Sequence, residues 1–390
     1  MPLDLSQAEV VDDHCHGFTI DKLLAAAPED FETRLTLTGL GISSSLRPDP
    51  AAWRRARELT ESTTYSLLAR RWLAERLGCE PEAGAVARAR RAAIEADPTG
   101  YIRSLLDDQR IVGLIADEGF PLPPIPAAEF ERAVGGVRVH RVVRLEQVVA
   151  EERDEAGSYA ELEGATERRL HEAADDPRTV AVKSIIAYRT GLDVEPATGE
   201  AAAEAFDRWR RGGFVESRGD AKPVRDRLLH VATDVARSRG LALHIHTGDG
   251  DPDIDLVHAR PSFLFPFLRD HRGQPIVLIH GGHPWSHEAG YIASVLPDVH
   301  VDLSVLLPWA GWTAERLLSD LIGSVPASKL LYGCDQASEP EVFWIAARLA
   351  RRALERVLGE AVRADYLTVE EAERLGRGIL AGNTRALHRL

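Results

Sequence analysis

The feature that most constrains the fold of this chain is a repeated alternation of short apolar segments with longer segments rich in Ala, Arg, Glu and Leu. Most of the apolar segments are continuous, which is typical of strands in a parallel sheet that is covered on both faces. Strands that alternate with helical segments predict repeated βα units. We therefore predict an α/β fold, a (β/α)₈ barrel of the TIM type. Its expected strands are residues 10–12, 111–116, 137–145, 180–187, 241–246, 276–280, 299–303 and 330–333.

The segment between the first and second expected strands is too long for an ordinary βα loop. Residues 17–108 are therefore interpreted as a helical insertion that forms a lid or a side layer, with helices at 51–77 and 83–108 and a turn at 79–81. Residues 341–390 are again helical in character and are expected to close the barrel. We expect residues 1–390 to form a single barrel domain.

Composition and charge exclude several classes of partner. The chain is 44% hydrophobic and 28% charged, an ordinary globular balance, and its formal net charge is −14. That negative charge disfavours nucleic acid and anionic membrane surfaces, which leaves a small-molecule substrate as the expected partner. A homodimer is compatible with the helical C-terminal segment.

The cysteines and the first residues bear on location. Cys15, Cys79 and Cys334 are odd in number and far apart, which does not suggest a disulfide framework. The N-terminal residues show neither a basic nor an apolar leader region, and no segment is long enough to span a bilayer. We expect a cytoplasmic protein.

Two histidines follow the first expected strand. Side chains two residues apart in a strand point the same way, so His14 and His16 can present two imidazoles to one ion. The pattern alone is weak, because histidines fall two apart by chance about as often as they bind metal.

Later strand ends carry further residues of ligand type. His246 ends the fifth expected strand, His280 the sixth, and Asp335 follows the eighth. In a (β/α)₈ barrel these ends converge on one mouth, where active sites lie. The set therefore predicts a metal site at the mouth. His244 lies deeper in its strand and is the one most typical of a buried structural histidine.

Several motifs in the same order resemble the amidohydrolase superfamily, and more closely the branch found as the N-terminal half of glutamine-synthetase-like fusion proteins. The resemblance covers most of the chain. It rests on residues 13–16, 115–119, 182–191, 246–253, 288–291, 301–304 and 332–335.

The resemblance implies a role for each matching residue. His14, His16, His246 and Asp335 would hold the catalytic metal, and Asp335 would also act as general base. Lys183 leaves two alternatives open. If Lys183 is carboxylated and bridges two ions, His280 is a ligand of the second; if Lys183 is a buried, paired lysine, a single ion is held and His280 is catalytic.

Other residues near the expected mouth are candidates for substrate contacts. Tyr188 and Arg189 follow the fourth expected strand, and the Arg189 guanidinium suits a substrate carboxylate. His283 and Trp285 lie beyond His280. The alternatives are a solvated arginine and aromatic packing. Charged residues at the same strand ends could shape the pocket or pair with one another: Asp117, Glu118, Arg144, Glu146, Asp249 and Asp251. Cys15 and Cys334 are expected to face the helices, as small apolar residues.

The first functional hypothesis is a metal-dependent hydrolase that cleaves a C–N bond of a small, carboxylate-bearing molecule with a metal-activated hydroxide. The alternatives are a metal-dependent non-oxidative decarboxylase on the same site and an inactive barrel with a regulatory or assembly role. Zn²⁺ is the default ion, one or two per chain, and His and Asp ligands suit Mn, Fe, Co or Ni as well.

Overall fold

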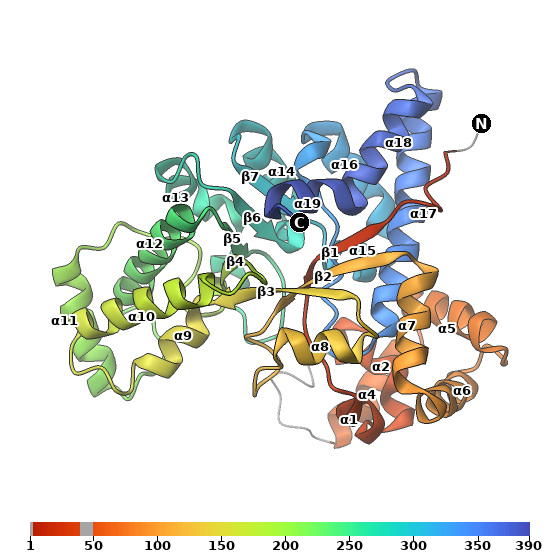
Figure 1. Ribbon diagram of the computed structural model, residues 1–390, viewed down its shortest axis with the longest axis horizontal. Coiled ribbons are helices and arrows are strands. Elements are labelled where there is room, and N and C mark those ends of the chain that lie inside the picture. The colour runs from red at the N-terminus through yellow and green to blue at the C-terminus, as the bar shows by residue number, and fades with distance from the viewer. Residues whose placement is uncertain (1–2, 40–49) are drawn as a thin grey trace.

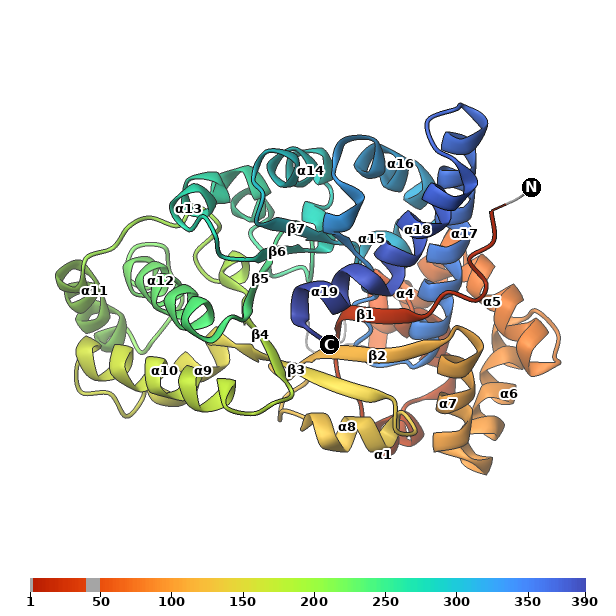
Figure 2. The same cartoon turned by 45° about the horizontal axis from the view of Figure 1, so that its top comes forward.

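Eight parallel strands, each beside its neighbour in chain order, form the centre of the molecule (Figures 1 and 2). The computed structural model describes residues 3–39 and 50–390. Backbone hydrogen bonds close the ring between the first and last strands, from Asp13 N to Tyr332 O at 2.8 Å and from Asp335 N to His14 O at 2.9 Å. The predicted (β/α)₈ barrel is confirmed. Its strands are β1 (Val10–Cys15), β2 (Ile111–Asp117), β3 (Arg138–Arg144), β4 (Thr179–Ser184), β5 (Ala242–His246), β6 (Ile276–Ile279), β7 (Val299–Asp302) and β8 (Leu330–Leu331).

Helices cover the outside of this ring (Figure 2). Local sequence sets several of their ends: the Thr63 hydroxyl accepts from Ser66 N at the start of α5, and Gly240 ends α12 in the left-handed region at φ 64°. The α-helices are α1 (Ile20–Ala25), α2 (Phe31–Arg34), α4 (Pro50–Thr60), α5 (Thr64–Leu77), α6 (Ala83–Ala96), α7 (Pro98–Asp108), α8 (Ala127–Ala133), α9 (Leu145–Glu152), α10 (Tyr159–Ala174), α11 (Gly199–Arg211), α12 (Lys222–Arg239), α13 (Phe265–Asp270), α14 (Ser286–Val295), α15 (Leu306–Trp309), α16 (Ala314–Ser324), α17 (Glu341–Arg363), α18 (Val369–Arg377) and α19 (Asn383–His388). The shorter helical turns are η1 (Pro28–Asp30), η2 (Ile186–Tyr188), η3 (Leu256–Ala259), η4 (Pro261–Leu264), η5 (His280–Gly282), η6 (Gly311–Thr313), η7 (Ala327–Lys329) and η8 (Gly378–Gly382).

The helices between β1 and β2 pack against α17 at one side of the barrel (Figure 1). A separate apolar cluster joins them, with Leu73 and Val86 from the insertion against Trp344 and Ile345 of α17. The Trp309 indole N–H also donates to Leu35 O at 2.8 Å, which ties the segment after β7 to the same helices. The insertion is therefore held from both α17 and the β7 side.

The barrel interior has an apolar layer that the C-terminal helix completes. Leu387 of α19 packs against two clusters of inward residues, one containing Ile115 and Val142 and the other Val277 and Leu331. Asn383 donates to Leu330 O at 2.8 Å at the beginning of β8. Helix α19 thus seals the end of the barrel where the strands begin, which we call the floor.

The first strand departs from a regular ladder. Its register against β2 shifts between Asp12 and Cys15, so side chains in this stretch do not simply alternate. Asp13 and His14 both contact interior residues. This irregularity positions the residues described next.

The described helices include none whose length and apolar character would let it cross a lipid bilayer.

Candidate metal centre

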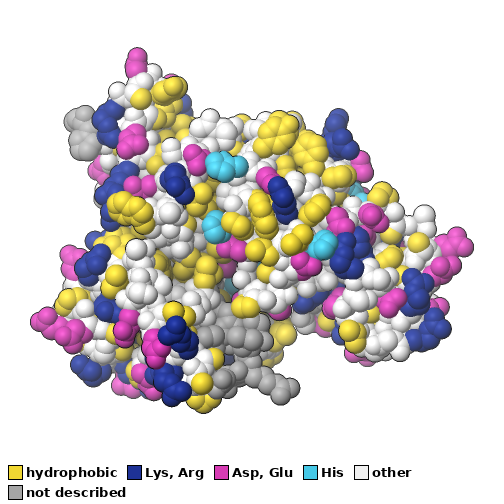
Figure 3. Space-filling model, turned by 180° about the vertical axis from the view of Figure 1, so that it is seen from behind, with side chains coloured by type: hydrophobic (Ala, Val, Ile, Leu, Met, Phe, Trp, Pro, Cys, Tyr) yellow, Lys and Arg dark blue, Asp and Glu magenta, His cyan; other side chains and the backbone are white. Residues whose placement is uncertain are grey.

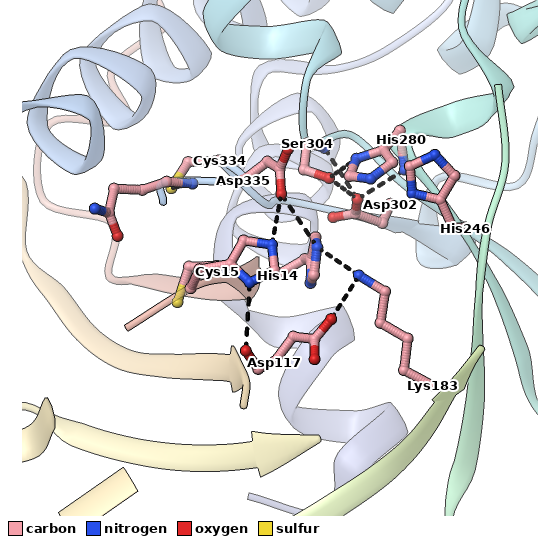
Figure 4. A network of polar contacts seen from close by, with 12 residues as sticks. His14, Cys15, Asp117, Lys183, His246, His280, Asp302, Ser304, Cys334 and Asp335 are labelled. Carbon is pink, nitrogen blue, oxygen red and sulfur yellow. Dashed lines mark hydrogen bonds and ion pairs between the residues drawn. The ribbon is translucent and has the colours of Figure 1, made fainter. Parts of the chain in front are cut away.

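Three predicted residues meet at the mouth, the end of the barrel where the strands finish. The Nε2 atoms of His14 and His16 lie 3.2 Å and 3.3 Å from Asp335 Oδ1. Figure 4 shows His14 and Asp335 directed toward each other. One potential ligand atom from each residue lies within 4.8 Å of the others. The His14 side chain is fully buried, and that of Asp335 is 19% exposed. We call His14, His16 and Asp335 the mouth cluster.

The backbone that carries this cluster joins β1 to the segment after β8. The Asp12 carboxylate accepts from His14 N at 3.2 Å and from Cys334 N at 3.1 Å. Asp335 itself has a positive φ of 53°, an uncommon conformation for a residue other than glycine. The β1 and β8 ends therefore present their ligand-type side chains from one hydrogen-bonded frame.

Lys183, on β4, lies beside the mouth cluster. Its Nζ is 2.8 Å from His14 Nε2 and 3.0 Å from Asp117 Oδ2. Arg144 pairs with the same carboxylate at 2.6 Å. These two cations hold the pKa of Asp117 well below its usual range although burial opposes this, and burial lowers the pKa of Lys183. Lys183 is thus a buried lysine with a carboxylate partner.

His246 and His280 lie next to the mouth cluster but outside its tight triad. Their ring centroids are 4.5 Å apart, and that of His280 is 5.4 Å from His14. His246 Nε2 is 3.0 Å from Asp249 O, a carbonyl that can only accept. Its lone pair is therefore on Nδ1 when the ring is neutral.

His280 is oriented by a chain of hydrogen bonds (Figure 4). Its Nδ1 is 2.9 Å from Ser304 Oγ, and that hydroxyl donates to Asp302 Oδ1. Because the serine proton points to Asp302, the network assigns the His280 proton to Nδ1 and leaves Nε2 as an acceptor.

Burial determines the charge of these groups. It lowers the pKa of His14 to about 4, with help from Lys183, and lowers the pKa values of His246 and His280 well below their usual range. Burial opposes ionisation of Asp335, but the imidazoles of His280, His14 and His16 hold its pKa well below the ordinary value. Neutral imidazoles beside an ionised carboxylate are the donor set of a divalent cation.

The predicted substrate-contact residues lie near His246 and His280. The Tyr188 ring is 4.6 Å from that of His246, and its hydroxyl accepts from Asp251 N at 2.8 Å. Gly250 is required here, because a Cβ would overlap the Tyr188 hydroxyl. The next residue, Arg189, is half-buried, and its guanidinium makes no hydrogen bond or ion pair within the described residues.

His283 and Trp285 already have protein partners. His283 Nδ1 is 2.8 Å from Asp249 Oδ2, and the Arg260 guanidinium lies 6.0 Å from the Trp285 ring centroid. Both side chains are half-buried.

The other charged candidates at the strand ends mostly pair with protein groups. Glu118 pairs with Arg141 at 2.8 Å, and Glu146 accepts from the Ser184 hydroxyl at 2.7 Å. The two cysteines are buried among apolar residues, and burial raises the pKa values of both Cys15 and Cys334 well above their usual range.

Some supporting residues had no usable signal in the sequence. The Gln336 amide, oriented so that both its ends are satisfied, donates to His16 O at 2.8 Å and accepts from Glu339 N at 3.1 Å. Glu339 in turn pairs with Arg90 of α6 at 2.5 Å and with Arg34. The insertion thereby supports the chain that carries the mouth cluster. Only the position of Glu339, shortly after Asp335, could have suggested this.

The face of the molecule opposite α19 carries mixed charge. In Figure 3, Lys and Arg side chains are interspersed with Asp and Glu, and no broad basic patch covers this side.

Comparison with known proteins finds a curated relative that matches over part of its length. The chain is 29% identical over 332 residues to Protein fluG of Emericella nidulans, a match that covers 78% of this chain and 38% of that protein. The chain thus corresponds to well under half the length of that curated relative.

Solved structures share the fold over almost the whole chain. A Lactobacillus casei protein proposed to be a metal-dependent hydrolase is 24% identical, with a TM-score of 0.84 over 100% of this chain and 98% of that one. Uronate isomerase of Thermotoga maritima is 15% identical, with a TM-score of 0.70 over 98% and 95% of the two chains. Glucuronate isomerase of Caulobacter crescentus is 17% identical, with a TM-score of 0.68 over 98% and 92%.

The family comparison covers more than half of the sequence. The profile described as amidohydrolase matches residues 114–389, from β2 to the C-terminal helix. This chain belongs to the amidohydrolase family.

Proposed function

We propose that this protein is a metal-dependent hydrolase that cleaves a C–N bond, an amide or a related linkage, in a small carboxylate-bearing molecule. The observation that carries the proposal is the mouth cluster, in which two imidazoles and one carboxylate lie around a common point. Such a set holds a catalytic ion with protein ligands and leaves room for substrate. When bound, a divalent ion there supplies Lewis acidity and lowers the pKa of a coordinated water.

The proposal assigns one ion to the mouth. Among the described residues, ligand atoms from His14, His16 and Asp335 converge within 4.8 Å, whereas His246 Nε2 is engaged by Asp249 O. Lys183 is already paired with Asp117. His246 would join the ion through Nδ1 or remain beside it. Zn²⁺ is the ion we expect, and the donor set also suits Mn, Fe, Co or Ni.

One residue of the site can carry protons during hydrolysis. Asp335 is ionised and can accept the proton of the attacking water at its carboxylate. The same proton can then pass from Asp335 to the leaving amine. His280 has its Nδ1 proton held by Ser304, so its Nε2 is left as a hydrogen-bond acceptor beside the site. The Arg189 guanidinium has no hydrogen bond or ion pair within the described residues, and it would supply a fork of donors for the substrate carboxylate.

The test is release of amine from a panel of small acids whose nitrogen is acylated, carbamoylated or amidino-linked, using protein loaded with Zn²⁺, Mn²⁺ or Co²⁺. We expect amine release by the loaded protein that disappears in Asp335→Asn. The matched control is Asp207→Asn, because Asp207 is an exposed carboxylate on α11 whose partner among the described residues is Arg210.

Other products would contradict the proposal. Carbon dioxide from an aromatic or unsaturated acid, without amine release, would make the same site a decarboxylase. Interconversion of aldose and ketose forms of a uronate would make it an isomerase like the two solved relatives. Loaded protein inert toward all these classes would favour a regulatory barrel.

A further inference from the structure

A second cluster of ligand-type residues lies deeper in the barrel, near the floor. His388 Nε2 of α19 is 3.0 Å from Asp13 Oδ1, and the His388 ring centroid is 5.2 Å from that of His244 on β5. One potential ligand atom from each residue lies within 4.8 Å of the others. Asp13 and His244 are 0% exposed, and the His388 residue is 8% exposed although its side chain is fully buried. We call Asp13, His244 and His388 the floor cluster.

Polar atoms of this cluster have no partner in the described part of the chain. Both ring nitrogens of His244 and Asp13 Oδ2 are buried without a hydrogen bond. Leaving a buried polar group without a partner is unfavourable, so two side chains of this kind facing one point indicate a ligand between them.

The hydrogen-bond partner of His388 Nδ1 limits which of its ring nitrogens can bind an ion. Its Nδ1 is 3.3 Å from Val180 O, a carbonyl that can only accept, so this nitrogen carries a proton. In a neutral ring the Nε2 lone pair then faces the Asp13 carboxylate. A neutral His388 would need a cation between Nε2 and Asp13 Oδ1, which lie 3.0 Å apart, whereas a doubly protonated His388 would donate to both acceptors.

The arrangement matches that of the mouth cluster. His16 Nδ1 is 3.3 Å from Asp117 O while its Nε2 faces Asp335, and the rings of His14 and His16 are 5.0 Å apart. A histidine that donates one ring nitrogen to a carbonyl and directs the other at a shared point is the usual form of a metal ligand.

We infer that Asp13, His244 and His388 form a second divalent-cation site, a structural zinc site that attaches the C-terminal helix to the barrel floor. Two imidazoles and a carboxylate are borderline ligands that suit Zn²⁺ at metal–ligand distances of about 2.1 Å. Helix α19 closes the site and lies far along the chain from the strands that carry Asp13 and His244. Ion binding there would therefore be coupled to docking of α19 on the barrel.

The experiment is elemental analysis of purified full-length chains after Zn²⁺ loading and gel filtration. We expect two ions per chain in the wild type, one in His388→Phe, one in His16→Ala, and none in the double variant. Leu387→Met, a packing change on the same helix, is the matched control and should retain both ions.

A crystal of the zinc-loaded wild type, with anomalous data at the zinc edge, covers the case in which His388→Phe fails to fold. A peak between Asp13 and His244 supports the inference. A water in that position, or a direct His388–Asp13 ion pair without metal, overturns it.

The outcomes separate this inference from the proposed function. A single ion that is lost in His16→Ala and kept in His388→Phe overturns the floor site only. A single ion that is lost in His388→Phe and kept in His16→Ala supports the floor site and removes the basis of the proposed function. Two ions of which one is lost in Lys183→Met, with His388→Phe unchanged, would place both ions at a carboxylated lysine and overturn the floor site.

Discussion

The mouth and floor clusters contain the same residue types, two histidines and an aspartate, but differ in their surroundings. At the mouth the Asp335 side chain is 19% exposed, and Lys183, His246 and His280 lie around the triad. At the floor the Asp13 and His388 side chains are fully buried, and α19 covers them. Similar donor sets can therefore serve different purposes: one that is open to substrate can catalyse, and one that is sealed can only hold structure.

The largest expected effect is a loss of catalytic activity when the mouth cluster is altered. Asp335→Asn removes the carboxylate that both mouth imidazoles face, so we expect turnover to fall about 10²–10⁴-fold, the size of a lost acid–base group. The measurement is the kcat/KM of amine release, with metal content determined on the same sample. A variant that keeps more than a tenth of wild-type activity would show that the mouth triad is not the reactive centre.

The next largest effect is expected on substrate binding, which should depend on residues at the mouth and not on those at the floor. Arg189→Gln removes a charged donor worth about 1.5–3 kcal/mol, so KM should rise about 10–100-fold with kcat nearly constant. Steady-state kinetics with carboxylate and carboxamide forms of one substrate measure this. An equal loss for both forms would mean that Arg189 does not bind the carboxylate.

A third change tests whether the insertion supports the mouth alone. Arg90 pairs with Glu339 at 2.5 Å and with Glu341 at 2.7 Å, both buried. Arg90→Met removes one buried cation from both carboxylates and leaves Glu339 with Arg34 and Glu341 with the Tyr101 hydroxyl. The loss of this buried pairing should cost about 3 kcal/mol in unfolding free energy. Through Gln336 it should also weaken zinc affinity at the mouth about tenfold.

Urea unfolding and competitive zinc titration measure the two effects of Arg90→Met. Equal loss of affinity at the mouth and the floor would contradict a specific link between the insertion and the mouth.

The smallest effect is expected at Cys15, which lies in sequence between the mouth ligands. Its sulfur is 3.4 Å from Ile115 O and the side chain is part of the apolar core. Cys15→Ala should therefore change kcat/KM by no more than about twofold while lowering stability by about 1 kcal/mol. Loss of either ion in this variant would reveal a thiolate ligand.

The sequence predicted the barrel strands whose ends form the mouth. Continuous apolar strands predicted the parallel barrel, and the strand-end residues predicted a metal site of His14, His16, His246 and Asp335 at one mouth. Ligand atoms of His14, His16 and Asp335 lie within 4.8 Å of one another, while His246 lies beside them with its Nε2 against Asp249 O. Periodicity suffices for such residues because the strand ends of a barrel share one face.

Residues outside the strand pattern could not be placed this way. Asp13 contacts the interior because β1 changes register between Asp12 and Cys15, and His388 reaches Asp13 across 375 positions of sequence. The engagement of His246 by Asp249 O depends on the loop after β5, in which Gly248 has a φ of 78°. Loop conformation and long-range helix docking are set by tertiary packing, which local spacing does not encode.

The most direct test of the account is the position of the ion at the mouth, determined by anomalous scattering at the zinc edge from crystals of the loaded protein. The account predicts a peak within bonding distance, about 2.0–2.2 Å, of His14 Nε2, His16 Nε2 and an Asp335 oxygen. A loaded crystal with no peak at this triad, or with the ion held by other residues, would contradict the assignment of the mouth cluster as the metal centre.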